Sequence, residues 1–368
     1  MSTGEQAITS GYVRPGGSVG IRNHVLVMPS VICSHQVADM IADEVEMAVS
    51  APHDHGCAQI GSDKAQTERT LVNLAANPNV AGTVVVGLGC EGLQSDSLAA
   101  TIGEGDRPVR ELSIQGIGGT DECVEQGTDF AKELVESAES ATQSVSLGDL
   151  TVGIVASDLS ESTLSTAAPH VASFVDDVIS AGGRVVAAGN EPLLADTEAA
   201  LEAFVPDARD DAAALLDHVR NQPAKVGRVR RQAKELSFAE ATRAWGEYPI
   251  EELLEYGARA THDSGLAVVD SSSEFASAST ALAAAGAEIV VHITSDGVPA
   301  GHPIVPVIKV TGNEDTAAAL PDDIDVDTTS ADADSLRRVV EDVANGADSA
   351  PERHGLTTFA IDRVGPSM

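Results

Sequence analysis

Along most of the chain, short runs of β-branched residues alternate with longer amphipathic stretches rich in Ala, Glu, Asp and Leu. This alternation is typical of βα units, because the helices that connect parallel strands must cover both faces of the sheet. In the first part of the chain the pattern predicts strands at residues 25–32, 46–51, 82–88 and 109–114. It predicts helices at residues 34–43, 64–76 and 121–140.

The same alternation starts again near residue 147. Here it predicts strands at residues 151–156, 184–188, 266–270, 288–293 and 305–310, with helices at residues 163–181 and 274–285. The chain has 368 residues, and single cores rarely grow beyond roughly 250 residues. We therefore expect an α/β protein with two lobes of mostly parallel, Rossmann-like or flavodoxin-like sheets, divided into residues 1–146 and 147–368.

The charge of the chain is strongly negative, with 57 acidic against 22 basic residues and a formal net charge of −35. The acidic side chains are spread over every segment, which favours a solvated surface adapted to high salt, where their mutual repulsion is screened. Such a surface repels phosphate backbones and anionic lipids. We therefore expect a halophilic host, and neither nucleic acid nor membrane as a partner.

Targeting signals and disulfide patterns are both missing from the sequence. The amino-terminal residues lack the basic flank and apolar run of a signal peptide, and no apolar stretch reaches about 18 residues. The four cysteines include no Cys-x-x-Cys pair, so they do not suggest a disulfide framework. These observations predict a cytoplasmic protein with reduced thiols.

Residues 227–245 hold the densest group of basic side chains in the chain. One interpretation is that this segment is a helix that packs across acidic neighbouring segments. The other is a surface that binds an anion or contacts another subunit, which also allows a homo-oligomer. The group consists of Arg228, Arg230, Arg231, Lys234 and Arg243.

Three cysteines, Cys33, Cys57 and Cys90, each come soon after a predicted strand. In an open α/β sheet, the loops at the carboxyl ends of the strands line the ligand crevice. The three thiols are therefore expected to converge at one edge of the first sheet.

The richest of these loops, residues 52–59, contains His53, Asp54, His55 and Cys57 around a glycine. Imidazole and thiolate are ligands that suit Fe(II) or Zn, and a catalytic site needs only two or three protein ligands. The alternative interpretation is that Cys57 is a small buried apolar residue and that the histidines lie on the surface of a polar loop.

Two glycine-rich loops could contact a ligand through their backbones. Residues 87–92 (Gly-Leu-Gly-Cys-Glu-Gly) combine three glycines with Glu91, and residues 116–120 (Gly-Ile-Gly-Gly-Thr) precede a predicted helix. An ordinary strand-to-helix turn explains the second loop equally well. No Walker A motif, complete Gly-x-Gly-x-x-Gly fingerprint or Gly-x-Ser-x-Gly motif occurs, so the sequence does not support nucleotide binding or serine hydrolysis.

In the second lobe, Lys309 is the only lysine of the last 130 residues and is a candidate cation for a substrate carboxylate. A surface lysine with an acidic partner is the alternative. His302 lies in a Gly-His-Pro turn after a predicted strand. The other seven histidines outside the 52–59 loop have no comparable surroundings, and we interpret them as structural or surface residues: His24, His35, His170, His218, His262, His292 and His354.

Several motifs in this order resemble the altronate/galactarate dehydratase family. They are residues 11–14 (Gly-Tyr-Val-Arg), 20–24 (Gly-Ile-Arg-Asn-His), 53–59, 87–92, 118–120 and the stretch 283–313. The resemblance implies a metal-dependent hydro-lyase that uses Fe(II), or another divalent metal, to convert a sugar acid or small hydroxy acid to a 2-keto-3-deoxy acid. In such chemistry a metal stabilises the enediolate while a tuned base removes the proton next to the carboxylate.

The resemblance also implies roles for individual residues. It makes His53, His55 and Lys309 candidate catalytic residues, and His55, Cys57 and Cys90 candidate metal ligands. The implied substrate-binding residues are Arg22, Asn23, Glu91, Gly118, Gly119, Thr120, Ser157, Asp158 and Asn313.

Two departures from the family pattern bear on partners and activity. Family members usually carry a small domain, or a separate small subunit in its place, before the Gly-Tyr-x-Arg motif, whereas only about ten residues precede Gly11 here. Either a separate small subunit is a partner of this chain, or the small domain is dispensable. In the second lobe, the family's Cys-Gly-Gly-Ser-Asp turn keeps only Ser157 and Asp158, and its Gly-Arg-Gly turn is Ser295-Asp296-Gly297. An alternative hypothesis is therefore a non-catalytic member that binds a small acid or serves as a structural subunit of a lyase, including a sulfo-lyase.

Overall fold

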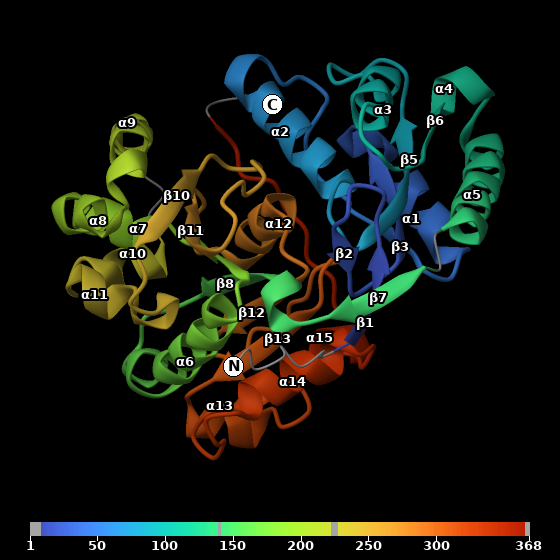
Figure 1. Ribbon diagram of the computed structural model, residues 1–368. Helices are drawn as coiled ribbons and strands as arrows, with labels where there is room; N and C mark the ends of the chain where they lie inside the picture. Colours follow the sequence, from blue (N-terminus) through green and yellow to red (C-terminus); the bar gives the residue numbers. More distant parts are fainter. Residues whose placement is uncertain (1–8, 139–140, 222–226, 365–368) are drawn as a thin grey trace.

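The computed structural model describes residues 9–138, 141–221 and 227–364, and its strands form three sheets. Two of the sheets are parallel, with four and seven strands, and helices alternate with their strands (Figure 1). The predicted α/β class is thereby confirmed. The third sheet is small and antiparallel, and the sequence pattern did not predict it. Its strands are β2 (Val19–Gly20), β1 (Thr9–Val13) and β7 (Thr142–Val145).

The four-stranded sheet is covered by helices on both faces. Val25 and Val27 pack against α1 and α5, whereas Leu26 and Met28 point to the opposite face, toward α2 and α3. Alternate residues of one strand thus enter two different cores. In spatial order the strands are β4 (Ala48–Ser50), β3 (His24–Pro29), β5 (Val80–Gly87) and β6 (Val109–Ser113). The helices are α1 (His35–Asp43), α2 (Gly61–Ala75), α3 (Ser95–Gly103), α4 (Ile114–Ile117) and α5 (Thr120–Ser137). The end of the helix predicted at 121–140 includes residues 139–140, which lie outside the described residues.

The seven-stranded sheet belongs to the second lobe. In spatial order its strands are β10 (Ile250–Leu254), β11 (Gly265–Val269), β9 (Arg184–Ala188), β8 (Thr151–Ala156), β12 (Ile289–Ile293), β13 (Val307–Thr311) and β14 (Val326–Asp327). The helices of this lobe are α6 (Ala168–Ser180), α7 (Glu191–Ala195), α8 (Thr197–Ala203), α9 (Arg209–Arg220), α10 (Arg228–Ala233), α11 (Phe238–Ala241), α12 (Phe275–Ala285), α13 (Glu314–Ala319), α14 (Ser335–Ala344) and α15 (Ala350–Arg353). The interpretation of residues 227–245 as one helix is wrong, because α10, α11 and a short 3-10 turn at Arg243–Trp245 divide this segment.

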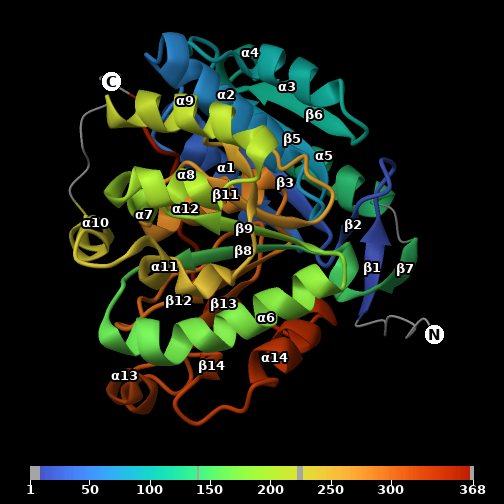
Figure 2. The same cartoon turned by 60° about the vertical axis from the view of Figure 1, so that its left-hand side comes forward.

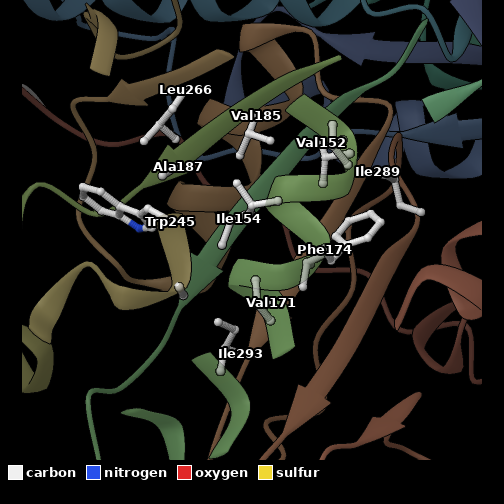
Figure 3. Packing of buried hydrophobic residues seen from close by; sticks show 14 of the residues in the cluster. Val152, Ile154, Val171, Phe174, Val185, Ala187, Trp245, Leu266, Ile289 and Ile293 are labelled. Carbon is white, nitrogen blue, oxygen red and sulfur yellow. The ribbon is translucent and has the colours of Figure 1, made fainter. Parts of the chain in front are cut away.

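One face of the seven-stranded sheet packs against α6 and α14 (Figure 2). Val152 and Ile154 of β8 meet Val171 and Phe174 of α6 in this core, and Trp245 lies at its edge (Figure 3). The helix predicted at residues 163–181 is present, although its first turn, Thr163–Ala167, is a π-helix that precedes α6.

The two lobes share a core built around α12. Every residue of this helix is buried, because it contacts both α2 of the first lobe and strands β8 and β9 of the second. Its sequence, rich in Ala and Ser, lets the two lobes approach closely. Leu71 and Leu74 of α2 belong to the same apolar cluster as Leu282 of α12. The lobes therefore share a continuous apolar cluster in addition to the core that each lobe has of its own.

The chain ends also connect the lobes. Near the amino end, Arg22 forms two hydrogen bonds of 3.0 Å with Glu352 of α15. At the other end, the segment 359–364 returns to the first lobe, where the carbonyl oxygen of Ile361 lies 2.9 Å from His55. Within the described ranges, none of the helices has the length and apolar character needed to cross a membrane.

Candidate active site

Three loops meet at the carboxyl ends of β3, β4 and β5. The amide of Ile32 donates to the carbonyl oxygen of His55 (2.8 Å), and the amide of Gly92 donates to that of Gly56 (3.1 Å). Gly56 has a φ of +94°, and a Cβ atom placed there would lie 2.2 Å from the carbonyl oxygen of Ser30. Only glycine allows this approach. Backbone contacts therefore hold the three loops against one another.

The thiols of Cys33, Cys57 and Cys90 are brought together by these loops. All three residues are exposed. Partial desolvation, followed by the neighbouring Cys57 and Cys90, raises the pKa of the Cys33 thiol, so the three groups lie within range of one another. The fourth cysteine, Cys123, is buried on α5 in the core of the first lobe. The loops that carry the three thiols are thus adjacent, and the convergence of the thiols at one site stays a prediction.

His53 is buried, and both of its ring nitrogens contact backbone groups. Nε2 lies 2.7 Å from the carbonyl oxygen of Pro29, to which it donates, and Nδ1 accepts a hydrogen bond from the amide of His55 (3.2 Å). Burial lowers the pKa of His53 to about 4, so the ring is neutral near pH 7. In this arrangement His53 fixes the path of the loop.

His55 is likewise buried, with 3% of its surface exposed. Its Nε2 lies 2.9 Å from the carbonyl oxygen of Ile361, and its Nδ1 lies 2.8 Å from the side-chain amide of Gln59. The structure thus contradicts the interpretation that the histidines lie on the surface and that Cys57 is buried, because the exposures are reversed.

Glu91 is a buried carboxylate beside the thiols. It accepts hydrogen bonds from the hydroxyl of Ser30 (3.1 Å) and from the amide of Gly89 (2.6 Å). Helix α4, which directly follows β6, lies next to this loop, because the amide of Gln115 donates to the carbonyl oxygen of Leu88 (3.0 Å). The turn after α4 leads through Gly118 and Gly119, both with positive φ, to Thr120 at the start of α5.

In the part of the chain that the structure describes, no three His, Cys, Asp or Glu side chains are close enough to hold one metal ion. The set His55, Cys57 and Cys90 remains a prediction. Cys57 and Cys90 offer exposed sulfur atoms, the soft donors that suit iron or zinc. His55 could join them only by giving up its contact with Gln59 or with Ile361.

Lys309 lies in the interior of the second lobe rather than on its surface, which excludes the surface alternative. Its ammonium group is 3.3 Å from the carbonyl oxygen of Val298, and burial lowers its pKa. His292, on the neighbouring strand, is hydrogen-bonded through Nε2 to the hydroxyl of Ser157 (2.7 Å). Burial, and then the positive charge of Lys309, lower the pKa of His292 to about 3. No motif around His292 distinguished it in the sequence.

Other predicted substrate-binding residues stabilise local structure. Burial raises the pKa of Asp158, but hydrogen bonds from Ser160, from the amide of Ser295 (2.8 Å) and from the hydroxyl of Thr163 (2.7 Å) outweigh it and lower the pKa. Asn313 donates to the carbonyl oxygen of Ser295 (3.1 Å). Arg22 is engaged by Glu352, as described above, and Asn23 accepts a hydrogen bond of 2.7 Å from Arg14.

A pocket of about 290 Å³ lies between the lobes, where α2 faces the carboxyl ends of β9 and β11. Four arginines contribute to its lining: Arg69, Arg220, Arg230 and Arg363. Arg69 forms an ion pair with Glu255, and Arg363 forms one with Asp54 in the loop of residues 52–59. Arg220 and Arg230 form no ion pair within the described residues, which is unusual in so acidic a chain. In the sequence, the indication of this pocket was the basic segment at residues 227–245, which contains Arg230.

Comparison with known proteins agrees with the arrangement of the chain. Two protein-family models match this chain. The model described as D-galactarate dehydratase/altronate hydrolase, second domain, matches residues 11–139. The model described as D-galactarate/altronate dehydratase, C-terminal, matches residues 231–367. The altronate dehydratase of Bacillus subtilis is 29% identical over 87% of this chain and 69% of its own length. The altronate dehydratase of Escherichia coli is 28% identical over 97% of this chain and 78% of its own length.

A third relative, the (2R)-sulfolactate sulfo-lyase subunit beta of Chromohalobacter salexigens, is 28% identical over 96% of this chain and 97% of its own length. The two family models cover separate parts of the chain, one in each lobe, and the relatives span both lobes. The chain therefore belongs to the D-galactarate dehydratase/altronate hydrolase family.

Proposed function

We propose that this protein is a lyase that removes water from a sugar acid or small hydroxy acid to give a 2-keto-3-deoxy acid. The observation that carries the proposal is the meeting of three thiol-bearing loops around the buried Glu91, close to an arginine-lined pocket. Family membership supports the reaction class, because two relatives are named altronate dehydratase.

Iron, as Fe(II), is part of this proposal, and another divalent metal is the alternative. Bound beside a hydroxy acid, such a metal would act as a Lewis acid that stabilises negative charge on the substrate. The residues of this chain would hold it through exposed thiols, of which Cys57 and Cys90 are candidates. Lys309, whose pKa is lowered by burial, is a candidate for proton transfer from the second lobe.

Arg220 and Arg230 are proposed to bind a substrate carboxylate in the pocket between the lobes. Among the described residues Arg220 and Arg230 form no ion pair, so they are the groups of this pocket that could attract an anion, although the carboxyl groups of Glu191, Glu255, Asp270 and Asp362 also line it. The Arg230→Gln variant is expected to raise KM for the acid about tenfold or more, since a charge-assisted hydrogen bond contributes about 1.5–3 kcal/mol. Arg231 does not line the pocket, so Arg231→Gln is the matched control.

The test of the activity is the formation of keto acid from a panel of sugar acids by protein purified anaerobically in high salt. Substrate-dependent keto acid would support the hydro-lyase. Binding of the acids without turnover, measured by calorimetry, would instead support the alternative of a small-acid-binding subunit.

A sulfo-lyase subunit is a second candidate, favoured by one specific observation. The subunit beta of the sulfo-lyase matches this chain over nearly the full length of both proteins, whereas the altronate dehydratases extend beyond the matched region. This candidate predicts a separate small partner subunit. Release of sulfite from (2R)-sulfolactate only when such a subunit is co-purified would favour it over the dehydratase, and the mass of the native complex would show whether copies of this chain also assemble.

A further inference from the structure

We propose that His292 is a positioning residue of the second lobe, which donates a hydrogen bond from Nε2 to Ser157 and so directs the Ser157 hydroxyl as a donor toward an oxygen atom of the substrate. The substrate contact rests on the proposed lyase function, which the inference deepens. The family resemblance implies a substrate-binding role for Ser157, but it assigns no role to His292.

The ring of His292 lies in the interior of the second lobe, on strand β12. Its chain neighbours Val291 and Ile293 face the core around α6, so the imidazole points to the opposite face of the sheet. There the ring of Phe275, the first residue of α12, lies 4.3 Å from the imidazole, centroid to centroid. His292 is fully buried. The surrounding side chains, rather than solvent, therefore determine the contacts of its two nitrogen atoms.

His292 stays neutral near pH 7, so only one of its ring nitrogens carries a hydrogen. Lys309 is its register partner on β13, and the two side chains lie on the same face of the sheet. A protonated imidazole would place a second positive charge beside this buried ammonium group. Burial, and then the charge of Lys309, lower the pKa of His292 to about 3. The position of the single hydrogen decides in which direction the hydrogen bond with Ser157 runs.

The other nitrogen of His292 favours a hydrogen on Nε2. Nε2 lies 2.7 Å from the hydroxyl oxygen of Ser157, whereas Nδ1 is buried without a hydrogen-bond partner among the described residues. In protein interiors, N–H groups without an acceptor are rarer than acceptors without a donor. A hydrogen on Nδ1 would create such an unpaired donor. With the hydrogen on Nε2, the imidazole donates to Ser157, and only an acceptor is left unpaired.

The opposite direction, in which the serine donates to the histidine, is typical of nucleophilic serine–histidine pairs. In those pairs a carboxylate accepts the hydrogen on Nδ1 and holds the ring. The carboxylate of Asp158 is close enough for its charge to act on His292. Its oxygens, however, accept hydrogen bonds from the amides of Ser160 (3.0 Å) and Ser295 (2.8 Å) and from the hydroxyl of Thr163 (2.7 Å). Asp158 therefore does not support a hydrogen on Nδ1.

The hydroxyl of Ser157 then has its own hydrogen available for a ligand. Ser157 is half-buried and follows β8 at the carboxyl edge of the seven-stranded sheet. On the adjacent strand β9, Asn190 occupies the corresponding position, two residues beyond the Val155–Ala188 pair, and it lines the pocket between the lobes. Ligands of open α/β sheets bind at this edge. The hydrogen of Ser157 suits an acceptor such as a carboxylate or hydroxyl oxygen of an acid.

The direction of the hydrogen bond is measured by nuclear magnetic resonance of the full chain with isotopic nitrogen in its histidines. Correlations between the ring nitrogens and the carbon-bound ring hydrogens show which nitrogen carries a hydrogen, and the His292→Gln variant identifies the signals of His292. His53 is an internal reference, because its Nε2 donates to a carbonyl oxygen and its Nδ1 accepts from an amide. We expect the same pattern for His292. A hydrogen on Nδ1 of His292 would overturn the inference.

A double-mutant cycle tests whether His292 acts through Ser157. His292→Leu removes the donor and keeps an apolar side chain against Phe275, and Ser157→Ala removes the hydroxyl. Each single variant should raise KM about fivefold, with a smaller change in kcat, since each loses one directed hydrogen bond to the substrate. The double variant should raise KM no further, because the two residues form one unit. His292→Gln, which retains an N–H donor, should restore most of the wild-type KM.

His302→Leu is the matched control, because His302 is also buried but has its contacts with Thr280 and Ile304. It should leave KM unchanged, and circular dichroism establishes that each variant is folded. Additive effects of the two substitutions, or an unchanged KM in Ser157→Ala, would overturn the inference.

The probes are six-carbon sugar acids, D-gluconate and D-galactonate among them. If the wild type forms no keto acid, the lyase function fails, and the cycle is measured on the dissociation constants of the same acids by calorimetry. Non-additive losses of binding would then still support the contact through Ser157. Absence of any binding to the wild type would reject that contact as well, whereas the resonance measurement would still decide the direction of the hydrogen bond.

Discussion

The hydroxyl of Ser30 donates a hydrogen bond to the carboxylate of Glu91 over 3.1 Å, and this contact joins the loops that follow β3 and β5. The other carboxylate oxygen accepts from the amide of Gly89. Glu91 therefore accepts hydrogen bonds from two donors, one in each of the two loops. The amide of Gly89 can only donate, whereas the hydroxyl of Ser30 can donate or accept.

The Glu91→Gln variant should consequently lose stability. The oxygen of Gln can accept from the Gly89 amide only if its nitrogen faces Ser30, so the hydrogen bond that Ser30 donates is lost or reversed, at a cost of about 1 kcal/mol. Urea unfolding measures the change in free energy of unfolding. Ser30→Ala, which removes only one of the two contacts, is the comparison, and an unchanged midpoint for Glu91→Gln would show that the carboxylate does not brace the loops.

Among the polar residues between the lobes, Asn79 should be one of those whose substitution lowers the free energy of unfolding most. Its side-chain oxygen accepts from the amides of Ile21 and Arg22, and its nitrogen donates to the carbonyl oxygens of Glu288 (2.8 Å) and Ile304 (3.2 Å). Replacing Asn79 by Ala would leave four buried backbone groups without this partner. We expect a loss of about 2–5 kcal/mol, measured by urea unfolding.

The matched control for this position is Asn73→Ala. Asn73 is half-buried and makes a single hydrogen bond, with the carbonyl oxygen of Gly257 (2.8 Å), also across the lobes. Its loss should cost only about 1 kcal/mol. Equal effects of the two variants would contradict the central role of Asn79.

Glu288 should destabilise the fold increasingly as the pH rises. Burial raises the pKa of this carboxyl to about 8 from an ordinary value of 4.5. The folded state then holds a proton that the unfolded chain has released, so stability falls between pH 4.5 and about 8. The slope is about 1.4 kcal/mol per pH unit.

The Glu288→Gln variant cannot ionise, and it should gain stability over the wild type across this pH window. At pH 4.5 and below, where Glu288 is protonated in both states, the two proteins should differ little. Free energies of unfolding at several pH values provide the measurement. Curves that run parallel for the two proteins would show that Glu288 is not held protonated in the folded state.

His302 has the opposite effect and should contribute to acid sensitivity. Burial lowers its pKa to about 3 from an ordinary value of 6.5, so the unfolded chain binds a proton that the folded protein excludes. Stability is therefore lost as the pH falls below 6.5, by about 1.4 kcal/mol per unit. His302→Asn keeps an acceptor near the amide of Ile304 but cannot ionise. Its stability should depend less on pH below 6.5, and an unaltered slope in urea unfolding would contradict this assignment.

The high negative charge predicts that the fold depends on salt. With a formal net charge of −35, lowering the ionic strength lengthens the range of repulsion between carboxylates from about 8 Å to about 30 Å. Circular dichroism should therefore show a loss of folded structure in low salt that returns when salt is restored. A full native spectrum in salt-free buffer would reject the halophilic interpretation.

Local patterning was sufficient to predict the four-stranded sheet and the five central strands of the seven-stranded sheet, but not its two edge strands, β10 and β14. The strand predicted at residues 82–88 is observed as β5, and that predicted at 184–188 is β9. Such agreement arises because a buried parallel strand must be a continuous apolar run, whatever its partners are. The same reasoning placed three cysteines at the carboxyl edge of the first sheet, since parallel strands end at a common edge. It missed the antiparallel strands β1 and β7, which are short and pair across more than 100 residues of sequence.

Packing between segments that are distant in the sequence determines which site residues are exposed and which partners they bind. His55 is buried because the carbonyl oxygen of Ile361 reaches it from the far end of the chain, and Cys57, two residues away, remains exposed. Lys309 lies in a strand whose burial is completed by neighbours that no local pattern identifies. The sequence by itself determined the two α/β lobes and the loops that carry the thiols, because secondary structure follows from local periodicity. Only the tertiary structure decided which of those side chains face solvent, because burial depends on segments that fold back from hundreds of residues away.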